Sequence, residues 1–180
     1  AIQNLVYDQR AIMQLGVKPH PSIFIQNAHK ETELTAENQN LWIENSWIGQ
    51  GWRLHRNHIL TGIPENNWQV ELPEGVCVDV VPVGKESYVL RPYGYDDTFS
   101  GEQQFEKRFP VTASVEDMGI LLNFMIGNDS SAVARNLYES LPKMSASDLS
   151  DKANLMRLQQ QRLQFRRENL SELARNHRRS

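Results

Sequence analysis

The segment 36–76 constrains the fold most, because it contains all four tryptophans of the 180-residue chain. A tryptophan side chain buries roughly 150–250 Å², so this segment should supply most of one hydrophobic core. Up to about Ile48 its apolar residues recur at helical spacing, whereas from Trp52 onward apolar and polar residues alternate as in a strand. We therefore expect a helix that ends near Gly49 and continues into a small sheet.

Elsewhere the apolar periodicity predicts mainly helices. They are expected at 4–17, at 147–176, from an N-cap at Ser114 to about residue 126, and from Asp129 or Ser130 to Leu141. Three or four strands should lie between residues 52 and 91. The predicted fold class is mainly α with a small antiparallel β insertion (α+β). We expect a helical-bundle body at 1–145, with the insertion at about 52–91, and a long helical or extended C-terminal tail at 146–180.

Composition excludes several broad classes of protein. No apolar run approaches the ~18–20 residues of a membrane span, and the N-terminal residues do not resemble a secretory signal. We therefore expect no membrane span and a soluble, unexported protein. The single cysteine, Cys77, excludes an internal disulfide framework and a cysteine-rich zinc site. We expect it to lie in a strand as a small apolar residue.

The charge is distributed unevenly along the chain. From residue 151 to 180, eight Lys and Arg stand against three Asp and Glu, a net charge of +5. Because the whole chain carries −3, the first 150 residues carry −8. Basic tails of this kind are commonly interaction segments for nucleic acid or for an acidic protein surface.

No catalytic or metal-binding constellation stands out in the sequence. His55 and His58 are three residues apart, so on a strand they face opposite sides and cannot chelate one metal. Asp79, Lys85 and Glu86 are the residue types of a nuclease site, but their spacing does not place them on one face. The sequence also lacks a Gly-rich phosphate loop, a Gly-x-Ser-x-Gly elbow and a Cys–His pair. We therefore predict that the protein is not an enzyme and has no metal site and no cofactor.

Two surfaces are candidates for binding other proteins. The polar segment 91–108 predicts a long exposed loop, whose acidic and aromatic residues suit a partner or a cation, although acidic turn residues commonly serve the turn alone. The tail has an apolar arc flanked by arginines, which fits either a surface helix with one buried stripe or a segment that orders on a neighbouring chain. The loop candidates are Tyr93, Tyr95, Asp96, Asp97 and Phe99, and the tail candidates are Leu155, Met156, Leu163, Phe165, Arg166, Arg167 and Leu170.

The order of these features resembles the head-to-tail connector (adaptor) proteins of short-tailed bacteriophages. The resemblance covers about residues 5–141, with a tail of the right kind. It is carried by the helix motif Arg10-Ala11-Ile12-Met13-Gln14-Leu15-Gly16-Val17, by a second helix over 36–52 that closes with a tryptophan, and by the strand start Leu72-Pro73-Glu74-Gly75-Val76.

The resemblance implies a structural virion protein without an active site. Members of that family form a homo-oligomeric ring, typically of twelve copies, below the portal protein, extend the DNA channel, and present a lower face to tail nozzle or fibre proteins. DNA would pass through without sequence-specific contacts, and assembly would occur in the host cytoplasm. The tail residues would then bind the portal or a neighbouring subunit, and the loop at 93–99 would bind the distal tail partner.

Two alternatives from other classes remain open. The arginine-rich tail fits a nucleic-acid-binding regulatory protein, although Phe165 is its only aromatic residue and single-strand binding uses several. Gly51-Trp52-Arg53 resembles the opening of a small ligand-binding β module of the calycin type, which needs about eight strands where we expect three or four. A nuclease is the least supported interpretation.

Overall fold

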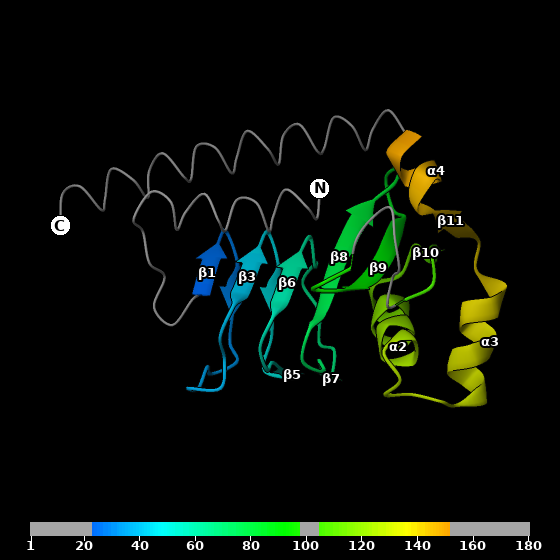
Figure 1. Cartoon of the computed structure of the whole chain (residues 1–180). Helices are drawn as coiled ribbons and strands as arrows, with labels where there is room; N and C mark the ends of the chain where they lie inside the picture. Colours follow the sequence, from blue (N-terminus) through cyan, green and yellow to red (C-terminus); the bar gives the residue numbers. More distant parts are fainter. Residues whose placement is uncertain (1–22, 98–104, 152–180) are drawn as a thin grey trace.

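The computed structural model describes residues 23–97 and 105–151, and this part of the chain is mainly β, not mainly α (Figure 1). The predicted helical bundle is therefore wrong. The strands are β1 (Ile23–Gln26), β2 (His29–Lys30), β3 (Leu41–Glu44), β4 (Trp47–Ile48), β5 (Trp52–Arg53), β6 (His58–Thr61), β7 (Val70–Glu71), β8 (Val76–Pro82), β9 (Tyr88–Gly94), β10 (Arg108–Thr112) and β11 (Lys143–Ser145). The helices are α2 (Val115–Met125), α3 (Ala132–Ser140) and α4 (Ala146–Asp151).

The first half of the described chain winds into a three-sided β-solenoid. Strands β1, β3, β6 and β8 pair in parallel, with Ile23 beside Leu41 and Leu41 beside His58, so each coil advances 17 or 18 residues. The other two sides are the parallel pairs β2–β4 and β5–β7. Figure 1 shows β1, β3, β6 and β8 side by side, with β9 and β10 continuing the same sheet in antiparallel order.

Asparagines in left-handed backbone conformation form the corners of the coils. Asn40 and Asn57 precede β3 and β6 with φ of 53° and 62°, and Gly75 takes the same place before β8 with φ of 83°. The side-chain amide of Asn40 donates to Asn57 Oδ1 at 3.0 Å, and Asn27 and Asn45 form an equivalent step at 2.6 Å at the next corner. Asparagine tolerates this conformation better than other non-glycine residues, and stacking satisfies its side chain.

The solenoid interior is the main hydrophobic core. Alternate residues of each strand point inward, and the aromatic rings of Trp52 and Trp68 meet there with centroids 5.8 Å apart. Trp42 instead points out of the sheet and Trp47 lies half-buried at a corner, so the tryptophans do not form one cluster. The inward residues of the long sheet include Leu41, Ile43, Leu60, Val76, Val78, Val80 and Leu90.

Helix α2 packs against the last coil and closes the core at that end (Figure 1). The indole nitrogen of Trp68 donates to the carbonyl of Val115 at 2.9 Å, and a Cβ at Gly119 would meet the Trp68 ring at 2.5 Å, so only glycine permits this approach. The predicted N-cap is confirmed, since Ser114 Oγ accepts from the Asp117 amide at 3.2 Å. Helix α3 is capped by Ser131, the residue after the two predicted caps.

The helix predicted up to Ile48 is wrong for a physical reason. Asn40 and Asn45 adopt left-handed φ on either side of the four-residue strand β3, which breaks any helix there. Both faces of β3 are buried, so its apolar residues run continuously and show no alternation in the sequence. The predicted helix 4–17 and most of the helix 147–176 lie outside the described residues, and the division at residue 145 stays a prediction.

The corner conformation can be tested at Asn57. Replacing it with Ala places a Cβ-branched backbone cost of about 1–2 kcal/mol in the left-handed region and removes the bond from Asn40, whereas Asn57→Gly retains the conformation and loses only the bond. We expect urea unfolding to show a loss of about 1–2 kcal/mol for Asn57→Ala and a clearly smaller loss for Asn57→Gly. Equal losses would contradict a role of backbone strain at this corner.

Candidate functional site

The outward face of the long sheet carries a row of apolar side chains across five strands. Phe24 pairs with Trp42, Trp42 with Ile59, and Cys77 with Tyr93, so the row follows the strand register from β1 to β9. Phe24 and Trp42 stack with ring centroids 4.0 Å apart. All five are buried, and Trp42, Ile59 and Cys77 are 0–1% exposed. We call this set the apolar row.

A second row on the same face is polar. Two residues further along each strand, Gln26, Glu44, Thr61, Asp79 and Arg91 pair in the same register. We call this set the polar row. Glu44, Thr61, Asp79 and Arg91 are at most 8% exposed, which is rare for charged side chains without defined partners. Charged residues on an outward sheet face that are nevertheless buried mark a contact surface.

Short contacts connect the polar row to its neighbours. Thr61 Oγ1 donates to Asp79 Oδ1 at 2.7 Å, and the other Asp79 carboxylate oxygen lies 3.7 Å from an Arg91 guanidinium nitrogen. The indole nitrogen of Trp42 donates to Glu44 at 2.9 Å, which connects the two rows. Arg91 also lies over the ring of Phe109, 5.2 Å from its centroid. The polar row therefore fixes side chains on four neighbouring strands.

His58 lies in the solenoid and does not form a metal site with His55. Its Nδ1 donates to the carbonyl of Val76 at 2.7 Å, and its Nε2 accepts from the backbone amide of His55 at 2.9 Å. Burial, opposed by the Val76 bond, lowers its pKa from 6.5 to about 4. The neutral imidazole therefore serves as a structural link between two coils. Within residues 23–97 and 105–151, no three potential metal-binding side chains gather.

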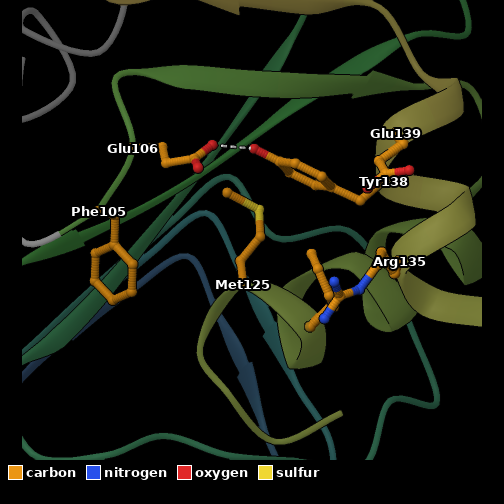
Figure 2. Close-up of a pocket in the computed structure, with 7 residues that line it drawn as sticks. Phe105, Glu106, Met125, Arg135, Tyr138 and Glu139 are labelled. Carbon is orange, nitrogen blue, oxygen red and sulfur yellow. Dashed lines mark hydrogen bonds between the residues drawn. The ribbon is translucent and has the colours of Figure 1, made fainter. Parts of the chain in front are cut away.

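A cleft of about 380 Å³ opens between α2, α3 and the segment before β10 (Figure 2). Figure 2 shows Met125 from α2 and Tyr138 from α3 facing Phe105 and Glu106 across it. The Tyr138 hydroxyl donates to Glu106, and burial together with this carboxylate raises the pKa of Tyr138. The other lining residues are Phe124, Arg135 and Glu139.

The cleft suits a small ligand with one apolar face. Its volume falls within the ~300–1,000 Å³ of typical ligand sites, and aromatic rings with a charged rim are a common lining. Arg135 and Glu139 contribute a cation and an anion one helical turn apart on α3. The raised pKa of Tyr138 keeps its hydroxyl protonated, so it acts as a hydrogen-bond donor and not as a base.

The predicted site residues fall in very different places. Tyr93 belongs to β9 and is buried in the apolar row, not in an exposed loop. Tyr95, Asp96 and Asp97 form a tight turn after β9, in which an Asp97 carboxylate oxygen accepts from the Gly94 amide at 2.7 Å. Phe99 and the tail candidates Leu155, Met156, Leu163, Phe165, Arg166, Arg167 and Leu170 lie outside the described residues.

The chain is similar to an enzyme. It is 40% identical over 213 aligned residues to the L-fucokinase/L-fucose-1-P guanylyltransferase of Bacteroides fragilis. The alignment covers all of this chain and 22% of that protein, so the chain spans about a fifth of the length of the curated relative it matches. No family model and no solved structure matches the chain.

This similarity overturns the phage interpretation. A bacterial sugar kinase and guanylyltransferase has no relation to head-to-tail connectors, so the predicted virion role and virion location are wrong. The predicted partners, namely portal protein, tail nozzle or fibre proteins, a twelve-copy ring and channel DNA, are wrong for the same reason. The prediction that the protein is not an enzyme is also contradicted, and neither the nucleic-acid-binding regulator nor the ligand-binding β module gains support. No described helix is long and apolar enough to cross a membrane.

The sequence did contain a signal for the rows. Asn27 and Asn45, like Asn40 and Asn57, are 17–18 residues apart and precede or follow similar apolar strings. A search for internal repeats at this period predicts stacked coils and therefore aligns Glu44, Thr61 and Asp79. With only two to three copies and glycine at the last corner, the repeat is easily missed.

The buried histidine predicts a pH dependence of stability. Because the folded pKa of His58 is about 4 and that of the unfolded chain is about 6.5, the unfolded chain binds more protons between these values. His58 therefore contributes fully above pH 6.5 and loses about 3 kcal/mol as the pH falls to 4. Urea unfolding across this range should show that His58→Gln removes most of this slope, while the control His55→Gln retains it. An unchanged slope in His58→Gln would contradict the assignment.

The ion pair of the polar row should matter more than a surface pair. Asp79→Ala leaves the Arg91 guanidinium, whose side chain is 10% exposed, without its partner, so we expect a loss of about 3–5 kcal/mol. The matched control is Glu74→Ala, which removes the 4.0 Å pair with Arg56 at the surface and should change stability by less than about 1 kcal/mol. Chemical denaturation measures both, and similar values for the two variants would contradict a structural role for the polar row.

Proposed function

We propose that this chain is the β-solenoid part of an enzyme that phosphorylates L-fucose and transfers a guanylyl group to L-fucose 1-phosphate. The observation that carries the proposal is the 40% identity to the Bacteroides fragilis enzyme, which extends over the whole chain. Identity at this level over 180 residues is incompatible with a chance similarity of composition. It supports a common fold for this segment in both proteins.

Within such an enzyme we propose that the solenoid is a rigid spacer and docking element. Parallel coils hydrogen-bonded along their length, a continuous core and interlocked Asn corners give it little freedom to bend. Such a body holds whatever packs on its ends and faces at fixed separation. Two consecutive reactions on one sugar, a phosphorylation and a guanylyl transfer, benefit from this arrangement because the product of the first is the substrate of the second.

The test is a pair of assays on the protein that carries this chain. With L-fucose and ATP, we expect transfer of the γ-phosphoryl group to the sugar and release of ADP. With L-fucose 1-phosphate and GTP, we expect transfer of the guanylyl group to the sugar phosphate and release of pyrophosphate. D-Glucose and D-glucose 1-phosphate serve as control substrates, and the absence of both activities with the fucose substrates would overturn the proposal.

A matched pair of variants tests the spacer role. Leu60→Ala opens a cavity in the solenoid core and should destabilise it by about 2–5 kcal/mol, whereas Val133, 74% exposed on α3, tolerates Ala. We expect Leu60→Ala to impair the conversion of L-fucose to its nucleotide form more than either separate reaction, and Val133→Ala to change neither. Full retention of the coupled conversion in a partly unfolded Leu60→Ala protein would count against the spacer role.

A further inference from the structure

The outward face of the long sheet is buried in the single chain, although α4 can cover only one end of it. Leu149 of α4 packs on Val81, Val89 and Phe109, at the end formed by β8, β9 and β10. The six residues of α4 extend about 9 Å, whereas the strands from β10 to β1 span about 24 Å at ~4.8 Å each. The cover over Trp42 and Ile59, each 1% exposed, must come from another part of the chain.

We propose that the C-terminal segment 152–180 docks on this face along the apolar row and the polar row. The inference is independent of the proposed enzymatic function, because it concerns only contacts within the chain. It keeps the predicted binding stripe of the tail and replaces its predicted partner with the chain's own sheet.

Continuity and length support this occupant. The described chain ends with α4 packed on the outward side of β8, β9 and β10, so the next residues start at the edge of the rows. If helical, the 29 residues that follow reach about 43 Å, more than the width of all seven strands of the sheet. The stripe residues Leu155, Met156, Leu163 and Leu170 recur on one arc at helical spacing and match an elongated apolar row.

Charge complementarity supports it as well. The polar row contains the carboxylates of Glu44 and Asp79 beside a single cation, Arg91. The segment 152–180 carries eight Lys and Arg against two Glu, and Arg166 and Arg167 flank the stripe. A basic amphipathic segment on a face with an apolar row and a partly acidic row satisfies both kinds of side chain. The −8 charge of the first 150 residues acts in the same direction.

Cys77 provides the measurement, because it is the chain's only cysteine and lies in the apolar row, fully buried. Burial also raises the pKa of its thiol, so it should react slowly with Ellman's reagent in the full chain. In the full-length double variant Leu163→Glu/Leu170→Glu, two charges in the stripe should release the tail and raise the reaction rate of Cys77 at least tenfold. The matched control Gln161→Glu/Gln164→Glu adds the same charge on the opposite side of the arc and should leave the rate unchanged.

Three further outcomes are informative. The uncharged variant Leu163→Ala/Leu170→Ala should raise the rate to a smaller extent, which keeps the test valid should the glutamates unfold the chain, as judged by circular dichroism. Unchanged Cys77 reactivity in both stripe variants, with the spectrum of the native protein, would overturn the proposal. A rate increase in Ile12→Glu but in neither stripe variant would also overturn it and assign the cover to residues 1–22.

Discussion

The hydrogen bonds between successive coils are the interaction on which the whole structure depends. Each short strand of two to seven residues is too small to be stable alone, and it persists because the coil 17–18 residues earlier and the coil 17–18 residues later present their backbone groups in register. The register holds only while every corner turns by the same amount. This is why asparagines or glycines with positive φ recur at the corners.

The same register creates the functional surface. Once coils stack, any residue type that recurs at one position of the coil becomes a row across the sheet, and its members contact each other although they are far apart in sequence. The apolar row and the polar row arise in this way, and so does the link from Val76 through His58 to His55. A solenoid therefore converts a repeat in one dimension into a flat contact surface, which suits a part of an enzyme that must hold other parts in place.

Local features were predictable from the sequence, and the coil stacking was predicted incorrectly. The cap at Ser114, the helix that follows it, the strand at Val76 and the placement of Cys77 in that strand all depend on residues within a few positions of each other, and the structure confirms them. The predicted helix over β3 failed because Leu41, Trp42 and Ile43 are apolar on both faces, so the period of two disappears. Resemblance in the order of elements then carried the error into the function.

The sequence by itself determined where the chain turns and which short segments begin or end, because Asn, Gly, Pro and capping Ser act on their own backbone. It also determined the separation of an acidic body from a basic tail. Only the tertiary structure decided that Glu44, Thr61, Asp79 and Arg91 form one buried row, that His58 is held neutral between two coils, and that Trp42 faces out of the core. Those properties follow from contacts between residues 17 or more positions apart, and no local preference of a residue specifies which distant strand lies beside it.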